Sequence, residues 1–128
     1  AFKVDRIYLC GICACPPSPE IHKSALGAED SVPWEHCDDT VELICRLKRE
    51  GYTAVSLEQT VNSVMMDGFR PEKGRRYALI FGNEVDGVSQ EAVDASDFSL
   101  EIPQFGTQHS LNVSVSIGIA LWHLRLFL

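Results

Sequence analysis

The sequence lacks an apolar run long enough to cross a membrane as a helix. Such a segment needs about 18 apolar residues, and the stretch 113–128 comes closest. Polar side chains interrupt it at Ser114, Ser116, His123 and Arg125. Internal repeats and low-complexity segments are also absent, and 128 residues is about the length of one domain. We therefore expect one globular domain with a modest core.

A secretory signal is also missing, because residues 1–15 contain no basic stretch followed by an apolar one. The five cysteines are an odd number, which without such a signal favours free thiols in a reducing cytoplasm. The spacing of Cys10, Cys13 and Cys15 faintly resembles a metal cluster. A fourth ligand of the kind that structural zinc prefers has no obvious source nearby, so we predict no metal site and a cytoplasmic protein.

Basic residues are scarce, with 11 Lys and Arg against 18 Asp and Glu and a net charge of −7. This balance argues against a protein that binds long duplex RNA through phosphates alone, because such binding scales with cationic contacts. The basic residues gather in two short segments, 46–49 and 73–76. A local patch of these side chains would still allow RNA binding, although each segment is also typical of a solvated helix end or turn.

Short apolar segments alternate with segments of helical periodicity, and this predicts an α/β fold with a mainly parallel sheet. The pattern of segment 60–67 fits either a short strand or a helix. Expected strands are 6–10, 53–57, 77–81 and 98–102, with 32–34 extended; expected helices are 20–26, 38–50, 89–93 and an amphipathic one from Ser110 or Asn112 to about 127.

Two loops, 81–87 and 102–112, each follow a predicted strand and so lie at the carboxyl edge of the sheet. Ligands of open α/β sheets bind at this edge, and Gly82 would let the backbone approach one closely. Read separately, each loop is a weak signal, because a glycine after a strand and a polar residue before a helix are both common.

Taken together, the two loops resemble a known family. GNExxG at 82–87 is similar to the second motif of the SpoU (TrmH) branch of SPOUT methyltransferases, and IPxxGxxxSLNVSV at 102–115 is similar to the third. Segments 25–29 and 32–34 also resemble the corresponding segments of proteins in this branch. The resemblance covers most of the chain and weakens toward the N-terminus.

The resemblance implies helices on both faces of the sheet and a C-terminal trefoil knot, an exception to the rule that chains do not thread loops. It also implies that S-adenosylmethionine is bound in the knot, largely by main-chain groups. Carried over by position, the cofactor contacts are Gly82, Ile102 and Leu111, with Leu57 or Glu58 bordering the adenosine. Family members are homodimers that pack through the final helix.

The activity implied is methyl transfer to a ribose 2′-OH of tRNA or rRNA. The enzyme aligns the hydroxyl with the electrophilic methyl group and assists removal of its proton. Glu84, Ser110 and Asn112 are the catalytic residues carried over. The Arg and Asn of the family's first motif would precede Ala1, so residues 1–128 are expected to be one methyltransferase domain truncated at its N-terminus.

Two alternatives stay open. The acidic charge and the missing first motif favour a non-catalytic knotted module that binds RNA or a partner. An unrelated nucleotide-binding α/β domain would share the loops but not the cofactor. Binding of S-adenosylhomocysteine distinguishes the family from the unrelated domain, and methyl transfer to RNA distinguishes an enzyme from an inactive module.

Overall fold

The computed structural model describes residues 1–11, 32–83, 86–107 and 111–128. The helix expected at 20–26 lies outside the described residues, as do Cys13, Cys15, Glu84 and Ser110. Contacts divide the chain into two units, Ala1–Leu43 and Ile44–Leu128, and each is described by itself.

The unit Ala1–Leu43 contains two parallel strands, β1 (Ile7–Cys10) and β2 (Trp34–Cys37). The Ile7 backbone N–H donates to the Pro33 carbonyl at 3.0 Å, which sets the register at the start of both strands. At their other end, Cys10 lies opposite Cys37. The strand expected at 6–10 is therefore confirmed, and the extended segment at 32–34 leads into the second strand.

Helix α2 (Thr40–Arg49) runs from the first unit into the second. Asp39 caps the start of the helix, because its carboxylate accepts a hydrogen bond from the Glu42 backbone N–H at 3.1 Å. The helix stops before Gly51, which has a φ of +97° that suits glycine.

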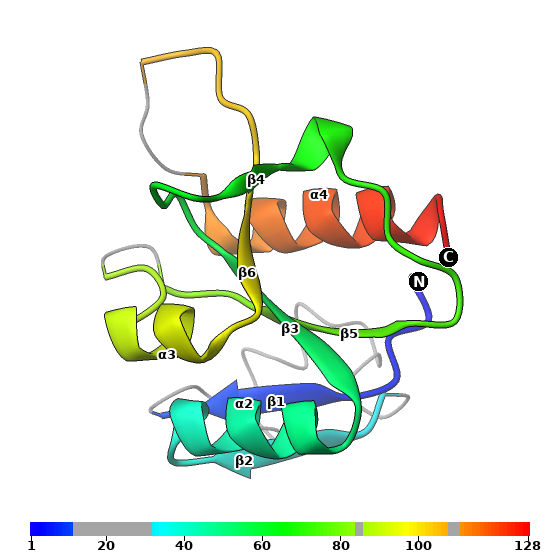
Figure 1. The fold of residues 1–128 in the computed structure, drawn as a ribbon, viewed down its shortest axis with the longest axis vertical. Helices are drawn as coiled ribbons and strands as arrows, with labels where there is room; N and C mark the ends of the chain where they lie inside the picture. The colour runs from blue at the N-terminus through cyan, green and yellow to red at the C-terminus, as the bar shows by residue number, and fades with distance from the viewer. Residues whose placement is uncertain (12–31, 84–85, 108–110) are drawn as a thin grey trace, which may run out of the picture. The chain divides into compact units, whose positions relative to one another are not determined.

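Four parallel strands form the sheet of the unit Ile44–Leu128, in the order β4-β6-β3-β5 (Figure 1). Their bounds are Tyr52–Leu57 for β3, Val64–Met65 for β4, Arg76–Ile80 for β5 and Phe98–Glu101 for β6. The ambiguous segment at 60–67 contains both structures considered, since β4 leads into the 3-10 helix η2 (Met66–Gly68). The mainly parallel sheet expected from the alternating pattern is confirmed.

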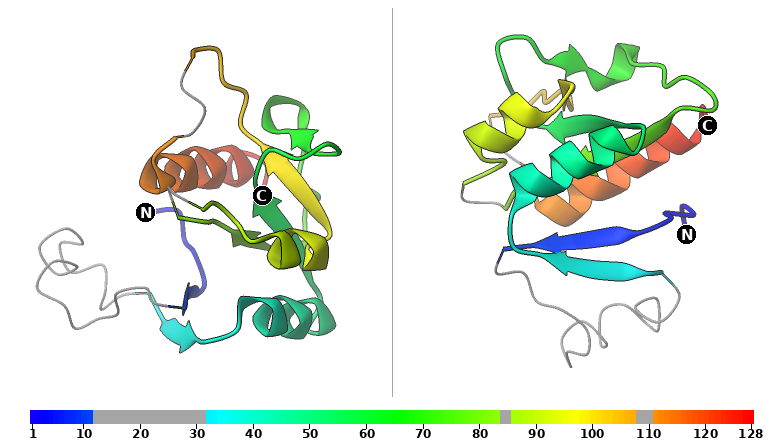
Figure 2. Two further views of the ribbon diagram at one scale, coloured as in Figure 1. Left: turned by 90° about the vertical axis from the view of Figure 1, so that its left-hand side faces the viewer. Right: turned by 60° about the horizontal axis from the view of Figure 1, so that its bottom comes forward.

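Helices cover both faces of this sheet (Figure 2). Ala54 and Val55, adjacent on β3 and fully buried, point to opposite faces. Ala54 packs with Ile44 of α2 and with Ala92 of α3 (Gln90–Ala95). On the other face, Val55 belongs to a buried cluster that includes two residues of α4 (Val113–Arg125). These two residues are Ala120 and Leu124, and the remaining members of the cluster are Met66 and Leu100.

The last helix differs from the amphipathic helix that the sequence predicts. Ala120 and Leu124 are buried, but Val115, Ile119 and Trp122 are exposed. These three side chains follow the four-then-three spacing of one helical stripe, on nearly the opposite side from the buried pair. The helix is therefore apolar on its outward side as well. Among the described residues, no helix is both long and apolar enough to span a bilayer.

Candidate functional site

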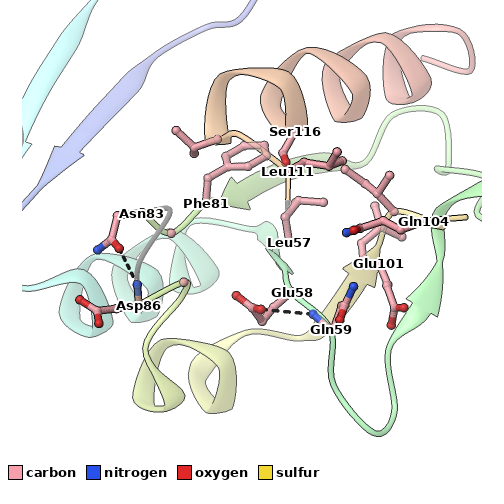
Figure 3. A pocket seen from close by; sticks show the side chains of 15 residues that line it. Leu57, Glu58, Gln59, Phe81, Asn83, Asp86, Glu101, Gln104, Leu111 and Ser116 are labelled. Carbon is pink, nitrogen blue, oxygen red and sulfur yellow. Dashed lines mark hydrogen bonds between the residues drawn. The ribbon is translucent and has the colours of Figure 1, made fainter. Parts of the chain in front are cut away.

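A pocket of about 310 Å³ opens at the carboxyl edge of the four-stranded sheet (Figure 3). This volume is at the lower end of the range for small-molecule sites. Four segments line it: the end of β3, the β5–α3 loop, the end of β6 with the loop after it, and the start of α4. The lining residues are Leu57, Glu58, Gln59, Phe81, Gly82, Asn83, Asp86, Gly87, Leu100, Glu101, Ile102, Gln104, Leu111, Val113 and Ser116.

The β5–α3 loop folds back tightly on itself at its glycines. A Cβ added at Gly82 would lie 1.9 Å from the carbonyl carbon of Gly87, a distance at which two carbon atoms cannot coexist. Gly87 has a φ of +66°, and its N–H donates to the Asn83 carbonyl at 3.0 Å. The Asn83 side chain accepts a further bond from the Asp86 N–H at 2.7 Å. Glycine is therefore required at 82 by space and favoured at 87 by conformation.

Glu58 connects the end of β3 to this loop. Its carboxylate Oε2 accepts a hydrogen bond from the Val88 backbone N–H at 3.0 Å. Its own backbone N–H donates to the Leu100 carbonyl at 3.2 Å, which holds the residue against β6. From the sequence, Glu58 is expected only as a possible border of the adenosine, because nothing local indicates that this carboxylate meets a loop 30 residues further along.

The pocket lining combines apolar side chains with amide and carboxylate side chains. Figure 3 shows Leu57, Phe81 and Leu111 grouped near the start of α4, and Gln59, Glu101 and Gln104 grouped beside β6. The charged side chains among the described lining residues are carboxylates, contributed by Glu58, Asp86 and Glu101, and none is basic. This lining suits a ligand that combines a flat apolar group with positive charge.

The structure brings together the four residues expected to contact a cofactor. Leu57, Gly82, Ile102 and Leu111 all line the pocket, although they come from four separate segments of the chain. Most of the polar lining was not predicted from the sequence, namely Gln59, Asp86, Glu101, Gln104 and Ser116. Gln104 lies within the third motif and Asp86 within the second. Their positions inside these motifs could have indicated that they line the pocket.

Of the three expected catalytic residues, the structure describes one, Asn112. Glu84 and Ser110 lie outside the described residues. Asn112 is exposed and is the N-cap of α4, where its Oδ1 accepts a hydrogen bond from the Ser114 N–H at 2.8 Å. It is not itself a lining residue, but its neighbours Leu111 and Val113 are. Asn112 therefore sits at the rim of the pocket with a capping role.

Residues 1–122 match the sequence profile of the SpoU rRNA Methylase family. The chain belongs to this family. It is 35% identical over 99 residues to the tRNA (guanosine(18)-2′-O)-methyltransferase of Aquifex aeolicus, a match that covers 75% of this chain and 44% of that protein. It is 34% identical over 126 residues to the 23S rRNA (guanosine-2′-O-)-methyltransferase RlmB of Nitrosomonas europaea, a match that covers 95% of this chain and 46% of that protein.

A solved rRNA methyltransferase structure has the same fold. The AdoMet-bound rRNA methyltransferase of Sinorhizobium meliloti superposes with a TM-score of 0.88 at 26% identity, over 99% of this chain and 48% of that one. This SpoU-family chain thus spans less than half of the length of each of these three proteins.

Proposed function

We propose that this chain binds S-adenosylmethionine in the carboxyl-edge pocket and provides the methyl-donor site of an RNA 2′-O-ribose methyltransferase. The observation that carries the proposal is the convergence of Leu57, Gly82, Ile102 and Leu111 on one pocket. The relatives with which the chain shares this family are named as enzymes that methylate guanosine at its 2′-O position in tRNA and rRNA.

The residues of the pocket fit the chemical groups of this cofactor. Leu57, Phe81 and Leu111 offer an apolar wall for an adenine ring. The absence of a Cβ at Gly82 lets the Gly87 main chain pack directly against it, so this part of the pocket wall consists of main-chain atoms. Two acidic side chains in the lining, Asp86 and Glu101, favour the ammonium and sulfonium cations, while the third, Glu58, accepts a hydrogen bond from the Val88 N–H. When bound, S-adenosylmethionine supplies an electrophilic methyl group.

The chain's own residues would then hold the acceptor. We assign Glu84, Ser110 and Asn112 to orienting the ribose 2′-OH and to assisting removal of its proton, as the family motifs imply. Asn112, at the pocket rim, is the member of this set that the structure describes. The acceptor is a ribose of tRNA or rRNA, and an RNA substrate together with the free thiols of Cys37 and Cys45 favours a cytoplasmic location.

We further propose that the C-terminal segment forms the trefoil knot of the family and that the protein is a homodimer. For the knot, support comes from the start of α4, where Leu111, Val113 and Ser116 line the same pocket as the β5–α3 loop. For the dimer, support comes from the outward stripe of α4. Val115, Ile119 and Trp122 are 49%, 38% and 60% exposed, which is unusual for a contiguous apolar row without a partner.

The alternative is a non-catalytic module that binds the cofactor or RNA without methylating it. The net charge of −7 and the engagement of Asn112 as a helix cap favour this alternative. Both functions require the same domain, so binding alone does not separate them.

Methyl transfer by the full-length gene product separates them. Bulk tRNA and rRNA are incubated with methyl-labelled S-adenosylmethionine and digested to nucleosides. We expect the label in ribose-methylated nucleosides; in the undigested RNA, the phosphodiester that follows each labelled ribose should resist alkaline cleavage, because that cleavage needs a free 2′-OH. Label on a base would contradict the proposed reaction, and an absence of label in a protein that binds S-adenosylhomocysteine would establish the non-catalytic module.

A further inference from the structure

The carboxylate of Glu58 lies between the end of β3 and the backbone at Gly87 and Val88. Oε2 accepts the Val88 N–H at 3.0 Å. A Cβ added at Gly87 would lie 2.7 Å from the same oxygen, so the carboxylate rests directly on the glycine. Both distances place this side chain against the end of the second-motif loop.

The side chain projects from a backbone that is itself fixed. Leu57 is paired with Leu100 in the β3–β6 ladder, and the Glu58 N–H continues that ladder by donating to the Leu100 carbonyl. Val88, at the other end of the contact, packs against a buried cluster that includes Ala54 and Ala92. Glu58 thus joins two anchored parts of the sheet edge.

The position of Gly87 determines the wall of the pocket at Gly82. The two glycines are in direct contact, since a Cβ at Gly82 would overlap the Gly87 carbonyl group. A shift of Gly87 would therefore change the surface that Gly82 presents to a ligand. Asn83, which bonds both Gly87 and Asp86, would move with it.

We propose that Glu58 is a positioning residue of the donor site: its carboxylate fixes Gly87 and Val88 against Gly82, and so sets the main-chain surface that the methyl donor meets. This inference rests on the proposed function for its ligand. The role requires a hydrogen-bond acceptor at this place and not a negative charge as such. The substitution Glu58→Gln retains a carbonyl oxygen able to accept the Val88 N–H, whereas Glu58→Ala removes the acceptor.

The first test measures S-adenosylhomocysteine binding by calorimetry in Glu58→Ala, Glu58→Gln and the matched control Glu72→Ala. Glu72 is an exposed carboxylate that pairs with Arg75 and does not line the pocket. The probe has a neutral sulfur, so it reports the shape of the site without attraction of a sulfonium cation. We expect Glu58→Ala to weaken binding by about tenfold or more, and both Glu58→Gln and the control to bind like the wild type.

The second test needs no ligand. Hydrogen exchange followed by NMR measures the protection of the Val88 amide against that of the β3 amides. We expect Glu58→Ala to lose about tenfold or more of the Val88 protection with the β3 amides unchanged, and Glu58→Gln to keep it. A general loss of stability would instead lower protection throughout the sheet.

Three results would overturn the inference. They are unchanged binding in Glu58→Ala, binding in Glu58→Gln as weak as in Glu58→Ala, and unchanged exchange at Val88 in Glu58→Ala. Failure of the wild type to bind the probe at millimolar concentration would overturn the proposed function, while the exchange experiment would still support or overturn the positioning of Val88.

Discussion

At the scale of single residues, the shape of the carboxyl-edge pocket depends on two glycines, Gly82 and Gly87. Gly82 lies where any Cβ would overlap the Gly87 carbonyl group. Glycine is required at 82 for steric reasons. At 87, glycine is favoured because the backbone has a positive φ and because the Glu58 carboxylate lies close to it. These two glycines bring the main chain to the pocket wall, beside the polar side chains of the lining.

A single methyl group at Gly82 should therefore destroy the site. In Gly82→Ala the loop must move away from Gly87, and we expect S-adenosylhomocysteine binding to fall by about a hundredfold or more. The matched control is Gly68→Ala, because a Cβ at Gly68 meets nothing within 4 Å and its φ is not in the left-handed region. Calorimetry on both variants checks this. Equal affinities would show that the loop does not form the cofactor wall.

At the scale of elements, the start of α4 combines a helix cap with the pocket rim. Asn112 caps the helix through the Ser114 N–H, while Leu111, Val113 and Ser116 line the pocket. The cap and the proposed catalytic role use the same side chain, so a loss of activity in an alanine variant alone would not identify its cause.

Substitution by aspartate separates the two roles of Asn112. Asn112→Ala removes the cap and should lower the free energy of unfolding by about 1 kcal/mol. Asn112→Asp keeps an acceptor for the Ser114 N–H and should retain wild-type stability, because Asp is an equally good N-cap. If the amide acts in catalysis, Asn112→Asp loses methyl transfer at unchanged stability. Wild-type activity in Asn112→Asp would leave Asn112 only its capping role.

The sequence predicts most element positions to within one or two residues, because those positions depend on local patterns. Ser89 and Asp39 cap the helices that their spacing predicts. Strand β4 is undecided from the sequence, since two residues carry almost no periodic signal. The outward apolar stripe of α4 is implied only by the family resemblance, through the dimer surface of the final helix, because the interspersed serines give the segment the periodicity of an ordinary amphipathic helix.

The residues of the pocket also fall into two groups: those that local sequence motifs predict and those whose contacts depend on the fold. Gly82, Ile102 and Leu111 belong to local motifs, and the structure places all three in the pocket with Leu57. Two carboxylates of the lining make contacts across the sheet edge instead: Glu58 accepts from Val88, and Glu101 accepts from the Ser63 hydroxyl at 2.6 Å. Such pairings depend on strand order, which no local pattern contains.

At the scale of the whole molecule, the outward stripe of α4 is the surface that we assign to a second copy of the chain. The stripe continues from Val115, Ile119 and Trp122 to Leu126, which is 58% exposed. A homodimer through matching helices would cover this row on both copies.

Charge on this stripe should disrupt the dimer. The double substitution Ile119→Glu and Trp122→Glu places four like charges in a two-fold interface, and we expect a monomer in analytical ultracentrifugation where the wild type sediments as a dimer. The control is Glu91→Gln on α3, an exposed position far from the stripe in sequence. A wild-type monomer at micromolar concentration, or a variant that is still dimeric, would contradict the assignment.

The carboxyl-edge pocket is, in our central proposal, the methyl-donor site of the protein. The most direct test is an NMR titration of the 128-residue chain with S-adenosylhomocysteine, following every backbone amide. We expect saturable shifts concentrated at 57–59, 81–88, 102–104 and 111–116. Shifts concentrated elsewhere, or none at millimolar ligand, would contradict this proposal.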